Sequence, residues 1–361
     1  MDFGLFCLMP QRDPQKSAGQ IAREAVEQAV LAEEFGFDAV WFAEHHFSNY
    51  SMIPSPLLMA AYAAGQTKRI HIGTGVLVLP LYEPARLVEE IAFVDQISQG
   101  RLYLGLGSGY QDYEFSRMGR RLADSQEAFV EFLDIIEQSF RTGELGHEGN
   151  HYKIPPAPLG IRPVQRPLPK IFVAGLAQNQ PVQERLARSG YVPFLAHHHR
   201  SPQTLIEPRA RLQGYWQKAG HEPQSMPLAT QRFVFVTENR SDEIEAAEHI
   251  LYTMRLALGL RFGTATLNGS ILNETPVANE PSVEEILAHT PIGPPERVTE
   301  LLAQDIRMLA PSHLSMMVQF GGLPQAKAMR SLQLLGTRVL PQLRNEFREK
   351  SGQAYNSAPA A

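Results

Sequence analysis

Three adjacent polar residues, Glu44, His45 and His46, follow a short apolar run at residues 39–43. The run is typical of a strand buried on both faces, and in parallel α/β folds the ligand binds at the carboxyl ends of such strands. Histidine titrates near neutral pH, so one imidazole can take or give a proton while Glu44 fixes its tautomer. The pattern favours an acid–base site; the alternative is a structural cluster in which the histidines bond loop carbonyls.

Two glycine-rich stretches follow other predicted strands. Gly73, Thr74 and Gly75 let another group approach the backbone closely, or they serve a bend in a barrel. The segment GLGSG at 105–109 lacks the spacing and the lysine of a phosphate loop, but it is a reasonable floor for a planar ring. Further along, Asn179 is the N-cap of a predicted helix whose free amides are suited to bind a phosphate.

Three more histidines, residues 197–199, end the sixth predicted strand. Consecutive strand residues point to opposite faces, so three adjacent imidazoles cannot ligate one metal ion while the strand stays regular. We therefore expect no metal site here. These histidines either shape a ligand pocket or belong to a solvated loop.

The elements that position these residues follow a repeating pattern. Apolar runs of strand length alternate with longer amphipathic stretches, which predicts a parallel sheet of βα units closed into a (βα)8 barrel with insertions. Capping signals place helices after Ser17, after Ser55, from Pro84 to about Gly100, and over 125–142. The eight predicted strands are 3–9, 39–43, 70–79, 102–106, 171–173, 192–196, 231–236 and 314–318.

We expect one barrel domain over residues 1–349, because no break in the alternation is long enough for a second core. Residues 146–169, rich in Pro and Gly, are expected to form an excursion before the fifth strand. Residues 258–282 mix Gly, Asn and Thr and are expected to form a mobile loop or lid. The tail at 350–361 is small and polar, which predicts flexibility.

Composition narrows the class of partner. The formal net charge is −5 and the basic residues are scattered, which argues against a nucleic-acid groove. No apolar run approaches a membrane span and the start lacks a basic flank, so we expect a cytoplasmic protein without a membrane partner. The single cysteine, Cys7, excludes an intrachain disulfide and is expected to be buried and inert.

The second and third predicted helices favour a homodimer. The segment LLMAAYAAG, residues 57–65, carries small residues that permit close helix approach. The third helix has apolar residues beyond one narrow stripe, including Leu87, Ile91 and Phe93. The alternative is that both helix faces pack on the barrel.

Taken in order, segments along nearly the whole chain resemble the bacterial luciferase-like flavin monooxygenase family. The combination of AEHHF, GTGVLVLP and SQGRLYLGLGSGY is highly specific. The segments are FGLFCLMP, FGFDAVWFAEHHF, IHIGTGVLVLPLYEPARLVEEIAFVDQISQGRLYLGLGSGY, the helix after LPKIFVAG, IGPPERVTELL and GGLPQAKAMRSLQLLGTRVLPQL.

The resemblance implies a barrel that binds reduced FMN at the carboxyl ends of its strands. In that family a separate NAD(P)H-dependent flavin reductase supplies the reduced flavin, which reacts with O2 to a C4a-peroxyflavin that oxygenates a small organic substrate. By position, the resemblance implies catalytic roles for His45 and Glu44 and a cis peptide between Gly75 and Val76. It implies flavin-binding roles for Gly75, Val76, Gly107, Ser108, Tyr110, Ala174, Gly175, Asn179 and Gln180, and a substrate pocket with His46, His197 and His198.

The chain departs from the family pattern at the flavin phosphate. Ser108 stands where luciferase carries a phosphate-binding arginine, and Gln126 stands near where many members carry another. The phosphate would then rely on Ser108, Tyr110, the cap amides at Asn179, or another arginine such as Arg185.

Two other interpretations of the chain stay open. One is a deazaflavin (F420)-dependent oxidoreductase of the same superfamily, which transfers hydride and needs no O2. The other is a non-catalytic relative that only binds flavin. Retention of FMN or deazaflavin by the pure protein, together with O2 consumption, would separate these possibilities.

Overall fold

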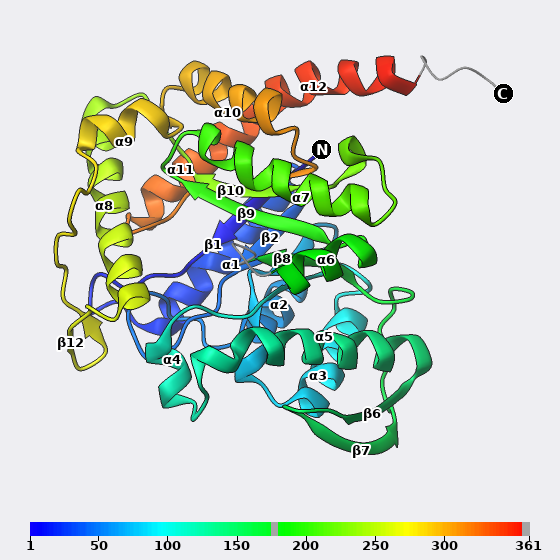
Figure 1. Ribbon diagram of the computed structural model, residues 1–361. Coiled ribbons are helices and arrows are strands. Elements are labelled where there is room, and N and C mark those ends of the chain that lie inside the picture. Colours follow the sequence, from blue (N-terminus) through cyan, green and yellow to red (C-terminus); the bar gives the residue numbers. More distant parts are fainter. Residues whose placement is uncertain (175–179, 356–361) are drawn as a thin grey trace.

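The computed structural model describes residues 1–174 and 180–355, with the backbone alone for 348–355. Within these residues a sheet of parallel strands closes on itself, because β3 (His71–Thr74) pairs with both β2 (Ala39–Phe42) and β5 (Leu102–Gly107). Figure 1 shows the helices lying around the strands. The predicted barrel is confirmed, and each predicted strand corresponds to one of its members. The barrel strands are β1 (Asp2–Cys7), β2 (Ala39–Phe42), β3 (His71–Thr74), β5 (Leu102–Gly107), β8 (Lys170–Ala174), β9 (Val192–His198), β10 (Ala229–Phe233) and β15 (His313–Met317).

Two predicted strands are interrupted. The run at 70–79 divides into β3 and β4 (Leu77–Val78), with a cis peptide between Gly75 and Val76, as the resemblance implied. The run at 231–236 divides into β10 and β11 (Phe235–Val236), and β11 leaves the barrel to pair with β14 (Ile292–Gly293). One continuous strand was the wrong prediction in both places, because apolar content does not show where a strand changes partner.

The helices predicted after Ser17 and Ser55 are present with their predicted N-caps. The Ser17 side chain accepts a hydrogen bond from Gln20 N at the start of α1, and Ser55 accepts one from Leu58 N at the start of α2. The long helix α5 ends at Gly143, whose φ of 85° suits glycine. The helices are α1 (Ala18–Glu34), α2 (Pro56–Ala64), α3 (Pro84–Ile97), α4 (Asp112–Arg117), α5 (Ser125–Thr142), α6 (Gln180–Ser189), α7 (Ile206–Lys218), α8 (Arg240–Phe262), α9 (Val283–His289), α10 (Pro295–Leu309), α11 (Gln325–Leu334) and α12 (Leu340–Tyr355).

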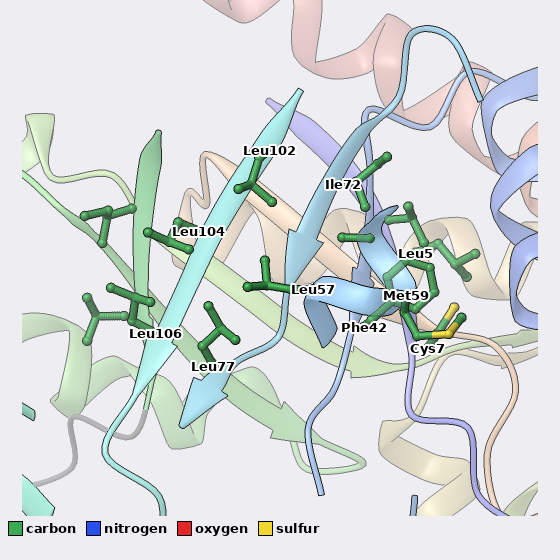
Figure 2. Packing of buried hydrophobic residues seen from close by; sticks show 14 of the residues in the cluster. Leu5, Cys7, Phe42, Leu57, Met59, Ile72, Leu77, Leu102, Leu104 and Leu106 are labelled. Carbon is green, nitrogen blue, oxygen red and sulfur yellow. The ribbon is translucent and has the colours of Figure 1, made fainter. Parts of the chain in front are cut away.

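Apolar side chains fill two layers. Figure 2 shows part of the outer layer, in which strand residues such as Ile72 and the α2 residues Leu57 and Met59 belong to one buried cluster. Cys7 belongs to this layer, and burial raises the pKa of its thiol to about 12, which agrees with the predicted buried, inert cysteine. The inner layer is centred on Trp41, and a Cβ at Gly73 would lie 2.2 Å from its ring. Gly73 therefore serves packing inside the barrel.

The insertions have structure of their own. Strands β6 (Glu144–Glu148) and β7 (Lys153–Pro158) form an antiparallel hairpin that begins two residues before the predicted excursion at 146–169. The prediction of a loop at 258–282 was wrong for its first residues, because α8 continues to Phe262. A short hairpin follows, formed by β12 (Leu267–Asn268) and β13 (Ile271–Leu272). Helix α12 passes the predicted tail boundary, and the rest of that tail, 356–361, lies outside the described residues. No described helix is long and apolar enough to cross a membrane.

Candidate active site

The polar residues predicted from the sequence gather at one rim of the barrel. Glu44, His45 and His46 directly follow β2, and Gly75 and Val76 directly follow β3. Gly107 ends β5, Ala174 ends β8 and His198 ends β9. Because all eight strands are parallel, these positions share the carboxyl end of the barrel, where barrel enzymes carry their sites.

Glu44 fixes an imidazole, but it is that of His46 and not that of His45. Glu44 Oε1 lies 2.9 Å from His46 Nε2, and its Oε2 accepts hydrogen bonds from Val78 N at 3.1 Å and from the Tyr82 hydroxyl at 2.7 Å. Side chains two residues apart leave an extended backbone on the same side, whereas neighbours diverge. Burial opposes the charge on His46, but the Glu44 carboxylate outweighs this effect and raises the His46 pKa.

His45 has a different carboxylate partner. Its Nδ1 lies 3.0 Å from Oε1 of Glu114, a residue of α4 that is 2% exposed. The same oxygen accepts a hydrogen bond from His46 N at 2.8 Å. A carboxylate that accepts at Nδ1 holds the proton there, so Nε2 of the neutral imidazole is left as the free acceptor. This is the arrangement of a proton acceptor with a fixed tautomer.

Glu114 was not among the residues predicted from the sequence. The only signal available was a carboxylate in the segment QDYEF at 111–115, seven residues beyond Gly107 at the end of β5. Gln111 of the same segment is buried, and its Nε2 lies 3.2 Å from His45 Nδ1. Its Oε1 has no hydrogen-bond partner among the described residues. Turning this amide would place the oxygen where it can also accept from Nδ1–H.

Two tyrosines surround the His45 ring. Tyr50 packs edge-on at 4.7 Å between ring centroids, and Tyr110 does so at 6.1 Å. Burial raises the pKa of the Tyr50 phenol, so it stays protonated at neutral pH. The guanidinium of Arg261, near the end of α8, lies 5.9 Å from the Tyr110 ring centroid. The imidazole is therefore enclosed by aromatic edges on the side of α8 and α4.

The glycines of β5 make room for the segment after β3. A Cβ at Gly105 would lie 1.8 Å from Thr74 O, and a Cβ at Gly107 would lie 2.7 Å from Val76 Cγ2. The Thr74 hydroxyl and Gly105 also exchange hydrogen bonds at 2.8 and 2.9 Å. Gly107 further approaches Ala174 O, 3.8 Å from the same Cβ position. Three predicted flavin-binding residues, Val76, Gly107 and Ala174, thus meet at the rim.

The predicted phosphate ligands are only partly brought together. Ser108 and Tyr110 follow Gly107 in the chain. Ser108 is half-buried, and Tyr110 is exposed. Arg185 is engaged elsewhere, in ion pairs with Asp134 at 2.5 Å and Glu137 at 3.0 Å on α5, so it does not supply the missing cation. Gln180 begins α6, where its amide donates to Glu184 at 2.8 Å. Gly175 and Asn179 lie outside the described residues.

The two histidines that end β9 face opposite sides. His198 lies inside, 5.6 Å from the Phe233 ring, and burial together with the neighbouring cationic groups lowers its pKa to about 3. His197 points outward and is fully buried against α10, with Nε2 3.4 Å from Asp305. The structure therefore does not bring His197 to the predicted substrate pocket, because side chains alternate along the strand.

A closed parallel barrel with a buried carboxylate and imidazole network at its carboxyl rim defines this chain as a barrel enzyme. The profile of the luciferase-like monooxygenase family matches residues 1–311, and the chain belongs to this family. It is accordingly an enzyme of the flavin-dependent monooxygenase class. The family resemblance seen in the sequence is confirmed.

Two curated relatives are similar to this chain over different shares of its length. An uncharacterized protein of Sinorhizobium fredii, y4vJ, is 34% identical over 342 residues, which are 94% of this chain and 97% of the relative. The oxygenase component of the flavin-dependent trigonelline monooxygenase of Acinetobacter baylyi is 33% identical over 181 residues, about half of each chain (50% and 50%).

Solved structures at low identity share the fold. A monooxygenase of Streptomyces bottropensis has a TM-score of 0.81 at 24% identity and covers 95% of this chain and 100% of its own. The oxygenating constituent of 3,6-diketocamphane monooxygenase of Pseudomonas putida, in complex with FMN, has a TM-score of 0.78 at 23% identity, with 95% and 99% covered. The coenzyme F420-dependent tetrahydromethanopterin reductase of Methanopyrus kandleri has a TM-score of 0.71 at 16% identity, with 94% and 99% covered.

Proposed function

We propose that this chain is the oxygenase component of a two-component FMN-dependent monooxygenase. It takes reduced FMN from a separate NAD(P)H-dependent flavin reductase and uses O2 to oxygenate a small organic substrate. The observation that carries the proposal is the contact at the rim between His45 Nδ1 and the buried Glu114. The similar proteins include an oxygenase component and a monooxygenase in complex with FMN, which supports it.

The rim suits a flat isoalloxazine ring. Gly105 and Gly107 carry no side chain where the segment after β3 packs against β5, and Gly75 and Val76 remain half-buried rather than covered. Val76, Gly107 and Ala174 would hold the ring, with Gly75 beside them. Ser108, Tyr110, Gly175, Asn179 and Gln180 would hold the ribityl phosphate.

Bound reduced FMN would supply the electrons that activate O2. The chain would supply proton control: His45 Nε2 gives or takes a proton, and Glu114 keeps the other nitrogen protonated. Glu44 holds His46 and, through Val78 N, ties the end of β2 to β4. We propose that His45 is the catalytic residue and that Glu44 has a structural role at the rim.

Water exclusion would come from the loops that cover the rim. Asn49, beyond His46, accepts a hydrogen bond from Leu272 N at 2.8 Å and donates one to Tyr252 at 3.2 Å. These bonds tie the β12–β13 hairpin to the loop after β2. We propose that this hairpin is the lid, and that His46 and His198 border the substrate pocket.

We also propose that the enzyme is a homodimer through α2 and α3. Leu87 and Ile91 of α3 are buried against the barrel, so they cannot belong to the predicted dimer interface. The outward faces nevertheless carry exposed apolar side chains on both helices, which a soluble monomer rarely groups together. They are Leu58 and Tyr62 on α2 and Phe93 and Ile97 on α3.

The function is tested by giving the pure protein photoreduced FMN, and in parallel reduced F420, and measuring binding without O2. O2 uptake and product formation are then followed across a panel of aldehydes, ketones and N-heterocycles. We expect FMN-dependent O2 uptake with at least one oxygenated product. Tight binding of reduced F420 with substrate reduction in the absence of O2 would replace the proposal with the hydride-transfer alternative.

A further inference from the structure

Asn49, in the loop between β2 and α2, is 1% exposed although it belongs to no helix or strand. Its side-chain Oδ1 accepts a hydrogen bond from Leu272 N at 2.8 Å, and its Nδ2 donates to Gln11 O at 2.8 Å and to the Tyr252 hydroxyl at 3.2 Å. Its backbone N donates to Ser270 O at 2.9 Å. The loops after β1 and β2, helix α8 and the β12–β13 hairpin therefore meet at one buried residue.

The β12–β13 hairpin makes a small contact with the rest of the molecule. Of the residues in its two short strands, Leu272 alone is buried. It packs in a small apolar cluster with Tyr252, Leu256 and Leu260 of α8, separate from the main core. Segments with few buried contacts open at a low free-energy cost. The hydrogen bonds from Asn49 thus hold a separable segment against the loop after β2.

A short path of contacts leads from Asn49 to the imidazole at the rim. His45 N donates to Ile53 O at 3.1 Å, so the loop from 45 to 53 is closed at its ends and Asn49 lies within it. Tyr50, the next residue, packs against both the hairpin cluster and the inner cluster of the barrel. Its ring lies edge-on to His45, with 4.7 Å between the centroids. Because Tyr50 is covalently joined to Asn49, a movement of Asn49 with the hairpin also moves the Tyr50 ring relative to His45.

We propose that Asn49 is a positioning residue that couples the β12–β13 hairpin to His45. With the hairpin seated, Asn49 holds Tyr50 against the imidazole. When the hairpin lifts, Asn49 loses its bonds to Ser270 and Leu272, and the edge contact that limits the tilt of the imidazole loosens. The inference rests on the proposed function, in which His45 is the catalytic residue and the hairpin is the lid. The acid–base group is then completed only when the lid closes the site to water.

Asn49→Ala tests the coupling in the full chain without flavin. We expect hydrogen exchange of the hairpin amides to become about 10–100-fold faster, because Leu272 N loses its buried acceptor. The ring signals of His45 in ¹⁵N-histidine-labelled protein should shift and broaden, whereas those of His147 stay unchanged. Tyr252→Phe is the matched control, since it removes another hydrogen bond of the same amide but keeps the ring and the bond to Leu272. Its hairpin exchange and His45 signals should match those of the parent.

A second variant reaches the same coupling from the lid. Residues 267–272 are replaced by glycine and serine at equal length, in the parent and in Asn49→Ala. If Asn49 acts through the hairpin, this replacement alone shifts the His45 signals as Asn49→Ala does, and the combined variant shows no further shift. A merely structural Asn49 would instead give independent shifts that add.

The proposal is overturned if the His45 signals of Asn49→Ala match those of the parent, if hairpin exchange is unchanged, or if the two changes add. Because these signals are measured without flavin, they test the coupling separately from the proposed function. A parent protein without FMN-dependent O2 uptake would count against that function alone.

Discussion

Nδ1 of His45 and Oε1 of Glu114 lie 3.0 Å apart, although 69 residues separate them in the chain. The contact joins the end of β2 to the helix that follows β5, and the closure of the barrel through β3 makes it possible. With Nδ1 held by Glu114, Nε2 is the nitrogen that we propose as the reactive one.

His45→Ala should lower the yield of oxygenated product per O2 by roughly 10²–10⁴-fold while the fold stays intact, because a positioned acid or base contributes about that much. The lost product should appear as H2O2, measured with a peroxidase assay. His147→Ala is the matched control, since His147 on β6 also has a carboxylate partner, Glu131 of α5 at 3.1 Å. Unchanged coupling in His45→Ala would make His45 a structural residue.

Glu114→Gln should reduce turnover by roughly one to two orders of magnitude with little change in KM, as expected for loss of a group that orients an imidazole. ¹⁵N spectra of histidine-labelled protein should show His45 in the Nδ1–H form in the parent and a mixture of tautomers in the variant. A single unchanged tautomer with reduced activity would show that Glu114 acts in another way.

The Glu44 and His46 pair should make stability depend on pH. Burial raises the pKa of Glu44 above its ordinary 4.5, and Glu44 raises the pKa of His46 above 6.5, so the folded state holds more protons than the unfolded chain. The stability that the pair contributes is therefore fully present at low pH, and it is lost as the pH rises through the folded-state pKa values.

The measurement is urea unfolding between pH 5 and 8 for the parent and for the double variant Glu44→Gln with His46→Gln, which removes both titrating groups. We expect the stability of the parent relative to the variant to fall as pH rises. A difference that grows with pH would contradict the assigned directions.

Gly105→Ala should destabilise the barrel by about 3 kcal/mol or more, because the new Cβ would lie 1.8 Å from the Thr74 carbonyl, which cannot move without breaking the β3–β5 contact. Gly214→Ala on α7 is the control, since nothing lies within 4 Å of its Cβ position. That change should stabilise by about 0.5–1 kcal/mol. Equal unfolding midpoints for the two variants would show that the rim tolerates the methyl group.

Leu58→Glu should convert a dimer to a monomer in light scattering at micromolar concentration. The side chain is 70% exposed on α2, and a charge there would be buried without a partner in the proposed interface. Phe262→Glu, at an equally exposed residue of α8, should leave the assembly unchanged. A parent protein that is monomeric at this concentration would remove the proposal.

Much of the barrel was predictable from the sequence, because buried parallel strands read as apolar runs between capped helices. The position of His45 at the rim was predictable for the same reason, since polar residues begin where β2 ends. The inward or outward direction of His197 and His198 was not, because strands buried on both faces show no alternation that fixes the phase. A shift in register between β9 and β10 beside them adds to the ambiguity.

The partners of the rim residues were less predictable than the residues themselves. Glu114 meets His45 only once β5 has closed against β3, and nothing local in the sequence encodes that approach. The pairing of Glu44 with His46 follows from their spacing of two, which the adjacency of Glu44 to His45 obscured. Arg185 looked available for a phosphate in the sequence, and its two acidic partners on α5 appear only in the fold.

A crystal structure of the chain with FMN tests the central claim most directly. We predict that the isoalloxazine ring lies against Val76 and Gly107, with His45 Nε2 facing the ring and the Glu114 contact intact. An FMN molecule bound away from this rim, or a protein that excludes FMN and binds F420 there, would contradict it.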